Sequence, residues 1–240
     1  MRALRRLLLL CVVAVAALVP ATALALDECR GLQECVSVVG PWVVVPASAD
    51  GGLVAVDWEL RCPLRGYVVG GTDARVTSSR VEVSIRGEKG SPVSPGVTTR
   101  RALTFTARRA AGEIAAFLPA IGCLPSDGGG GRSQTAVRRS QPVLQPGTAL
   151  QRRVAIARIP AGARRIVVAS CPKGTRRVAA SHAVGFVTTD PPVAAVLGSV
   201  RTTAGTTATT ARVVAERSVV VGRGIRALVQ VHVVCARSGS

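Results

Sequence analysis

Aromatic residues are scarce in this 240-residue sequence and make up 2% of it. Proteins that bind sugars or single-stranded nucleic acids usually stack their ligands on exposed aromatic rings. We therefore expect neither sugar-specific nor specific nucleic-acid recognition. Trp42, which follows Gly40 and Pro41, is the one ring that the sequence predicts to be exposed.

Histidine is almost absent as well, with only His182 and His232. A catalytic nucleophile needs a base and an orienting group beside it, and the sequence has no Gly-x-Ser-x-Gly elbow. His232 falls on the outward parity of an alternating strand, so we expect both histidines to be surface residues. The glycines at 128–131 are not followed by the Lys-Ser/Thr of a phosphate loop. The sequence thus predicts no catalytic residue, no cofactor and no metal site.

Long apolar runs are confined to the N-terminus. Three arginines (Arg2, Arg5 and Arg6) precede an apolar stretch at 7–19, and the small residues Ala23 and Ala25 follow. This is the pattern of a secretory signal peptide, and the stretch is shorter than the roughly 20 residues of a membrane-spanning helix. We expect residues 1–25 to be a signal peptide, the protein to be secreted or extracytoplasmic, and no transmembrane span to follow.

An even number of cysteines remains once Cys11 is removed with the signal peptide. In an exported chain an even number predicts a disulfide framework. Six cysteines allow fifteen pairings, so composition alone does not determine the connectivity. The six are Cys29, Cys35, Cys62, Cys123, Cys171 and Cys235.

Strand patterns dominate the rest of the chain. Residues 54–62 alternate apolar and polar side chains, and residues 81–86, 103–106 and 229–235 do the same. Such a period of two is typical of half-buried strands, and frequent Gly, Pro, Ser and Thr clusters suit a β-sandwich. The only helix-like stretch runs from about Ala107 to Phe117. The sequence therefore predicts an all-β fold.

The two halves of the sequence resemble each other. Cys62-Pro63 and Cys171-Pro172 lie 109 positions apart, and apolar runs ending at Cys123 and Cys235 lie 112 apart. We therefore predict two tandem β-sandwich-like domains, at 26–123 and 147–240, joined by a Gly/Ser/Pro-rich linker at 124–146. If both halves fold alike, Cys62 pairs with Cys123 and Cys171 with Cys235, which leaves Cys29 and Cys35 to pair together. The threonine-rich segment at 202–211 is expected to be a hairpin loop, with an O-glycosylated or contact loop as the alternative.

The shared pattern resembles repeats in uncharacterised secreted proteins of actinobacteria. Its parts are Cys-Pro, a nearby glycine, a valine with two small residues, and a final strand that ends in cysteine. The second half has Ala179-Ala180 where the pattern carries glycines. The resemblance covers roughly residues 43–123 and 154–235, and it implies an architecture but no activity.

Positive charge is concentrated in the second half. The chain has a formal net charge of +18, and residues 121–240 hold seventeen basic side chains against three acidic ones. Guanidinium groups bind phosphate and carboxylate groups through paired hydrogen bonds. We expect a non-enzymatic structural or binding protein that contacts an anionic envelope polymer or lipid headgroups, against the alternative of a solvated basic surface without a specific partner. The candidate anion-binding residues are four adjacent pairs, Arg138 and Arg139, Arg152 and Arg153, Arg164 and Arg165, and Arg176 and Arg177.

Carboxylates in the first half suggest a second function. Asp57 and Glu59 share one face of a predicted strand, with Glu82 on another, so a secreted hydrolase that uses a carboxylate pair is an alternative. Arg61 and Arg86 have the same outward parity, and cross-strand ion pairs would explain these residues equally well.

Overall fold

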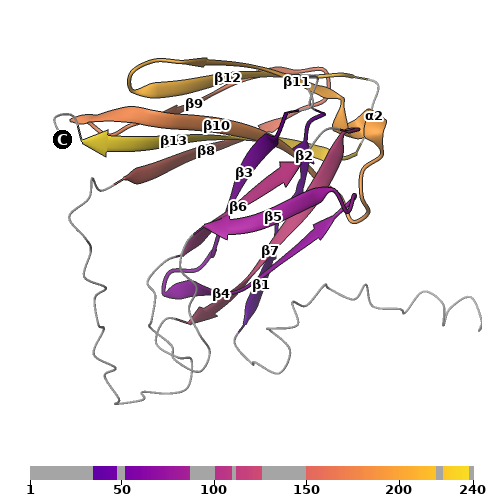
Figure 1. The fold of residues 1–240 in the computed structure, drawn as a ribbon, viewed down its shortest axis with the longest axis horizontal. Coiled ribbons are helices and arrows are strands. Elements are labelled where there is room, and N and C mark those ends of the chain that lie inside the picture. The colour runs from indigo at the N-terminus through magenta and orange to yellow at the C-terminus, as the bar shows by residue number, and fades with distance from the viewer. Residues whose placement is uncertain are drawn as a thin grey trace, which may run out of the picture.

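The structure, a computed structural model, describes residues 35–47, 52–86, 101–109, 112–125, 150–219 and 224–237. Most of these residues belong to strands, and Figure 1 shows the strands of the two halves lying across each other. In this part of the chain no helix is both long and apolar enough to cross a lipid bilayer. The predicted all-β class is therefore confirmed. The predicted signal peptide lies outside the described residues.

A central antiparallel sheet contains strands from both halves. Strand β7 has β4 on one edge, and β1 and then β2 along the other. The sheet continues from β2 to β10, β13 and β8. Its seven strands are β1 (Val36–Val39), β2 (Trp42–Val45), β4 (Tyr67–Val76), β7 (Ala115–Pro125), β8 (Gln151–Ile159), β10 (Thr175–Val187) and β13 (Arg226–Arg237).

Two smaller sheets cover the central sheet on opposite faces. The first has the order β3-β6-β5, with β3 at Val54–Arg61, β5 at Val81–Arg86 and β6 at Ala102–Arg109. The second has the order β11-β12-β9, with β9 at Arg164–Ser170, β11 at Val200–Thr206 and β12 at Thr210–Arg217. A single-turn helix, α2 (Ala194–Leu197), precedes β11.

The two halves have the same strand order. The trio β4-β7-β1/β2 in the first half corresponds to β10-β13-β8 in the second, and β3-β6-β5 corresponds to β9-β12-β11. Each half also contains one long-range disulfide, Cys62–Cys123 or Cys171–Cys235, which confirms both predicted pairings. Two β-sandwich-like units, each with one disulfide, are thus observed as predicted, whereas their origin by repetition stays a prediction. Cys35 is disulfide-bonded, and its predicted partner Cys29 lies outside the described residues.

The side chains of the central strands point alternately into two separate hydrophobic cores. Val43 and Val45 pack with Trp58 and Phe105 under the first small sheet. Trp42, one residue away, packs instead in the core of the second half. Successive side chains of a strand point to opposite faces, so β2 contributes to both cores. The sequence prediction of an exposed Trp42 is wrong, since its ring is 2% exposed and Arg75 lies over it at 5.4 Å.

The junction within the central sheet is a short pairing of β2 with β10. Only Trp42 with Phe186 and Val43 with Gly185 are paired there. A Cβ atom on Gly185 would lie 2.5 Å from Cγ of Pro41 and 3.2 Å from the ring of Trp58. Glycine is therefore required at this position for the two halves to approach closely.

Two other local predictions have clear outcomes. The helix-like stretch near Ala107 to Phe117 is wrong, because β6 runs to Arg109 and β7 begins at Ala115. Those apolar residues are buried on both sides of β7, which removes the alternation that would mark a strand. The loop expected at 202–211 is much shorter than predicted, because β11 runs to Thr206 and β12 begins at Thr210, which leaves residues 207–209 as the turn of a hairpin. The strand β7 extends to Pro125, two residues into the predicted linker.

Candidate functional site: an arginine-lined cleft between the halves

The outward face of β3 is half-buried against the second half. Asp57 and Glu59 were predicted to face solvent with Arg61, but only Arg61 is exposed. The β8, β10 and β13 strands supply the side chains that meet them. The alternation in β3 correctly predicted which side chains share its outward face. It did not predict that the second half of the chain packs on this face and half-buries Asp57 and Glu59.

A cleft of about 440 Å³ opens where these strands meet, and we call it the arginine cleft. Its volume falls within the range of about 300–1,000 Å³ that is typical of small-ligand sites. It is lined by side chains from both halves, which are Glu59, Arg61, Arg86, Arg101, Ala102, Thr104, Leu150, Arg152 and Val234. Four of these nine residues are arginines, so the cleft is a candidate site for an anionic group.

Strand register places three of the arginines side by side. Glu59 and Arg86 both pair with Thr104 in the first small sheet, so their side chains share one row on its outward face. Arg61 follows two positions after Glu59 on the same face. Arg101 immediately precedes β6 and meets the loop that follows β3. The sheet therefore brings together residues that are up to 40 positions apart.

The four guanidinium groups differ in how their hydrogen bonds are used. Arg61 forms an ion pair with Glu59 at 3.3 Å, and Arg152 forms one with Asp57 at 3.4 Å. Arg101 donates from Nη2 to the carbonyl oxygens of Cys62 at 3.1 Å and Pro63 at 3.4 Å. Its Nε is buried and has no hydrogen-bond partner in the described chain. Among the described residues the hydrogen bonds of Arg101 use only Nη2, and arginine has five N–H donors, so donors remain for an acceptor in the cleft.

Asp57 lies behind the cleft and joins the two halves. Thr106 donates to it at 2.7 Å, Ser181 at 3.3 Å and Arg152 at 3.4 Å. Burial alone would raise the pKa of Asp57, but the hydrogen bond from Thr106 and the charges of Arg152 and Arg86 together lower it. Asp57 is therefore ionised at neutral pH and fixes the position of Arg152.

His232 lies beside Arg152 and is 1% exposed, so the prediction of a surface histidine is wrong. Nη1 of Arg152 lies 3.1 Å from Nδ1 of His232, and Nε2 lies 2.6 Å from Oε1 of Gln230. Arginine only donates, so Nδ1 must accept and Nε2 carries the proton. Burial, together with the charge of Arg152, lowers the pKa of His232 to about 4 against a smaller opposite effect of Asp57.

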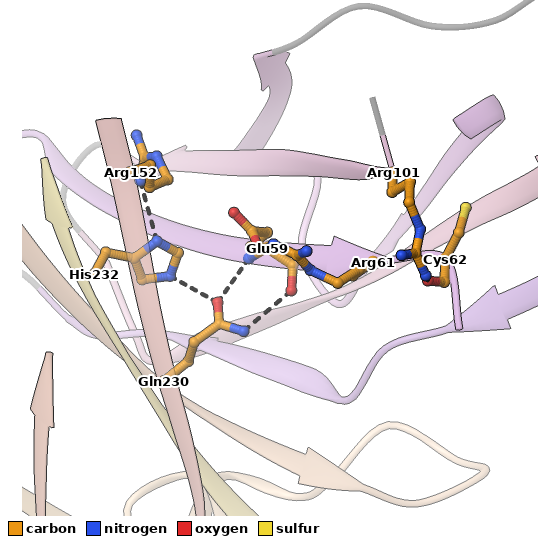
Figure 2. Close-up of polar contacts among 7 residues, drawn as sticks. All are labelled: Glu59, Arg61, Cys62, Arg101, Arg152, Gln230 and His232. Atoms are coloured by element: carbon orange, nitrogen blue, oxygen red, sulfur yellow. Dashed lines mark hydrogen bonds and ion pairs between the residues drawn. The ribbon is translucent and has the colours of Figure 1, made fainter. Parts of the chain in front are cut away.

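Gln230 closes the network against the free edge of β3. Its Oε1 accepts from the backbone N–H of Glu59 at 2.7 Å, and its Nε2 donates to the carbonyl oxygen of Glu59 at 3.1 Å. One carboxamide thus replaces a neighbouring strand at this edge. Figure 2 shows the resulting chain of contacts from Arg152 through His232 and Gln230 to Glu59.

The cleft as a whole is positively charged. Four guanidinium groups face the carboxylates of Glu59 and Asp57, which leaves an excess of two positive charges. Neither Arg86 nor Arg101 forms an ion pair with a carboxylate among the described residues. A phosphate or carboxylate group could bind both of these side chains without first breaking an ion pair.

The arginine pairs predicted from the sequence do not gather at one place. Arg152 lines the cleft, but Arg153 points to the other face of β8 and is exposed. The pairs at 164–165 and 176–177 belong to β9 and β10, where Arg164 forms an ion pair with Glu216 and Arg177 donates to the carbonyl of Thr207. Arg138 and Arg139 lie outside the described residues. As an anion site, these eight residues stay a prediction.

Three of the four cleft arginines come from the half that is nearly neutral in sequence. Arg61 and Arg86 were interpreted as cross-strand ion-pair partners, and Arg101 was not singled out. The only indication of the cleft in the sequence was that Arg61 and Arg86 lie on the outward faces of their predicted strands. It did not reveal that a second domain covers the same face and forms a cavity.

The carboxylate pair gains no support as an acid–base pair. Such catalysis requires one carboxyl whose pKa is raised, whereas the pKa of Asp57 is lowered. Glu59 is paired with Arg61, and Glu82 is exposed on β5.

The chain was compared with models of protein families, with curated proteins and with solved structures, and none of the three comparisons gave a match.

Proposed function

We propose that this protein is a secreted, non-enzymatic binding protein that holds an anionic group of cell-envelope material in the arginine cleft. The observation that carries the proposal is the pair Arg86 and Arg101, which lines a 440 Å³ cavity without a carboxylate partner among the described residues. The two disulfides are compatible with an oxidising, extracytoplasmic location.

The ligand chemistry is a phosphate or carboxylate group on a polymer. Guanidinium groups bind both groups through two parallel hydrogen bonds. A polymer suits the site because the cleft opens to solvent and the described surface carries further exposed arginines outside it, such as Arg153 and Arg212. These surface charges would speed encounter with a polyanion, while the cleft would hold one of its groups.

The test is the affinity of the full mature chain for a fluorescent glycerol phosphate oligomer across a salt series, with oligoglutamate as a second arm. The double variant Arg61→Gln/Arg86→Gln removes two exposed cleft charges. Hydrogen bonds to charged groups contribute about 1.5–3 kcal/mol each, so we expect at least a tenfold loss of affinity for one or both oligomers.

The matched control is Arg153→Gln/Arg212→Gln, which removes the same charge from exposed positions outside the cleft. It should weaken binding by no more than about threefold, in line with the small contribution of exposed charges. Equal losses in the two double variants would show that bulk charge alone attracts the polymer. Absence of binding to either oligomer at low salt would contradict the proposal altogether.

A further inference from the structure

A buried arginine lies at the end of the inner face of the first small sheet. Arg109 is the last residue of β6 and is 4% exposed. It is paired between Val54 of β3 and Val81 of β5, which both pack in the core of the first half. Its Nε and Nη1 atoms are buried and have no hydrogen-bond partner among the described residues. A positive charge is therefore held at the end of an apolar core without an acceptor at these two nitrogens from the described chain.

The second half has an equivalent arginine with a protein acceptor. Arg217 is the last residue of β12, the strand that corresponds to β6, and is 6% exposed. Its Nη1 donates to the carbonyl oxygen of Ile159, the last residue of β8, at 3.3 Å. No carbonyl of the described chain takes this place beside Nη1 of Arg109. The two halves thus bury an arginine at the same position, but the first half leaves its charge less well compensated in the part that the structure describes.

A second guanidinium group lies beside Arg109. Arg80 immediately precedes β5 and is exposed. A Cβ atom on Gly112 would lie 2.5 Å from Nη2 of Arg109 and 3.4 Å from Nη1 of Arg80. Both nitrogens are thus close to one point and at most about 6 Å apart, so the two positive charges repel each other. Neither guanidinium group forms an ion pair with a carboxylate of the described ranges.

From this geometry we infer that Arg80 and Arg109 form a second anion site, which takes a single phosphate group. The two guanidinium groups supply two positive charges, and a phosphate monoester carries about −1.5 to −2 at pH 7, so one phosphate group balances the pair. A carboxylate would neutralise only one of the two charges. Nη2 of Arg109 and Nη1 of Arg80 would donate to the phosphate oxygens in charge-assisted hydrogen bonds. A buried charge without a partner is unfavourable, so binding of the anion would stabilise the folded state.

This site is separate from the arginine cleft. Thr104, which lines the cleft, lies five residues before Arg109 in β6. At about 3.4 Å per residue the two positions are about 17 Å apart along the strand, and an odd number of steps places them on opposite faces of the sheet. The inference therefore does not depend on binding in the cleft.

The test is a titration of the full mature chain, with its disulfides intact, with inorganic phosphate. The Nε–Hε signals of the arginine side chains are followed by NMR, and sodium chloride at equal ionic strength is the reference. We expect saturable shifts at Arg80 and Arg109 that chloride does not produce. Glycerol 3-phosphate is the second arm. Tighter binding of this ester would identify the ligand as an organic phosphate, and tighter binding of inorganic phosphate would identify it as the free ion.

Matched variants test the location. Arg80→Gln removes the exposed member of the pair and should weaken phosphate binding at Arg109 at least tenfold, because a charge-assisted hydrogen bond is lost. Arg108→Gln removes the same charge from the preceding residue, which is exposed on the other face of β6, and should leave the affinity within twofold. The cleft variant Arg61→Gln/Arg86→Gln should also leave it unchanged, so failure of the cleft and failure of this site can be told apart.

Three results would overturn the inference. The first is an Arg109 signal that does not move in tens of millimolar phosphate, and the second is an equal shift in sodium chloride. The third is an equal loss of affinity in Arg80→Gln and Arg108→Gln, which would show that general surface charge attracts the anion. Tryptophan fluorescence during urea unfolding checks that both variants are folded.

Discussion

Acid should destabilise this protein through His232, well above the pH at which carboxylates titrate. The side chain is buried, accepts from Arg152 and donates to Gln230, so the folded state holds the neutral ring. Its pKa is lowered to about 4 from a usual value of 6.5. The folded state thus binds fewer protons than the unfolded state between these two values. Stability is complete above pH 6.5 and falls as the pH approaches 4.

The size of the effect follows from the two pKa values. Linkage gives a loss of about 2 kcal/mol in the free energy of unfolding between pH 7 and pH 5, and about 3 kcal/mol by pH 4. Domains are stable by only about 5–15 kcal/mol, so a loss of this size is measurable. Asp57 affects stability only at lower pH, because its pKa is lowered from the usual value of 3.8.

Urea unfolding at pH 7, 6 and 5 measures this loss, with the disulfides intact. The buried rings of Trp42 and Trp58 report unfolding by fluorescence. His232→Gln should be less stable than the wild type at pH 7 but should lose about 2 kcal/mol less on going to pH 5. His182→Gln retains His232 and should keep most of the steep dependence. It should lose only a smaller part, because burial lowers the pKa of His182 as well.

The reasoning would be refuted by identical pH dependence in the wild type and His232→Gln. It would also be refuted if the ring of His232 titrates near 6.5 in the folded protein, as followed by its carbon-bound proton signals in NMR. Either result would mean that the network does not exclude the protonated ring.

Three further changes should alter stability by amounts that urea unfolding can measure. Gln230→Met leaves the backbone N–H and carbonyl of Glu59 unpaired, and should cost about 2–4 kcal/mol at pH 7. Gly185→Ala forces a Cβ atom against Pro41 at the junction and should cost about 1–3 kcal/mol, whereas Gly205→Ala, with nothing within 4 Å, should be nearly neutral. Replacing both cysteines of either long-range disulfide by serine should cost about 4 kcal/mol, and peptide mapping of the unaltered protein under non-reducing conditions should recover the pairs Cys62–Cys123 and Cys171–Cys235.

Alternation in the sequence predicted strands accurately wherever one face is solvated or lightly covered. The strands β3, β5 and β13 were expected from this pattern and are confirmed. The strand β7 was partly misread as helix, because its nine residues from Ala115 to Cys123 are all buried and carry no period of two. Local pattern cannot separate strand from helix in such a run.

The errors at His232 and Trp42 share a physical cause. Each residue was expected to face solvent, but the side of the strand on which it lies is covered by residues from the other half of the chain. Polar residues on that face of β13 were assigned to solvent because polar side chains are usually exposed. Here they are buried and hydrogen-bonded to β3 and β8 instead.

The arginine cleft was beyond the reach of sequence reasoning for the same reason. Net charge directed attention to the second half, whereas Arg61, Arg86 and Arg101 belong to the first half. Their proximity to Arg152 depends on the packing of the two halves, which no spacing in the sequence encodes. The disulfides, by contrast, were predictable because each lies within one half.

The central claim is that the cleft, and not the basic surface in general, binds the anion. Phosphate titration followed through the Nε–Hε signals of the arginine side chains tests it most directly. Saturable shifts at Arg61, Arg86 and Arg101, with much smaller ones at Arg153 and Arg212, are the predicted result. Weak and uniform shifts across all exposed arginines would contradict the account.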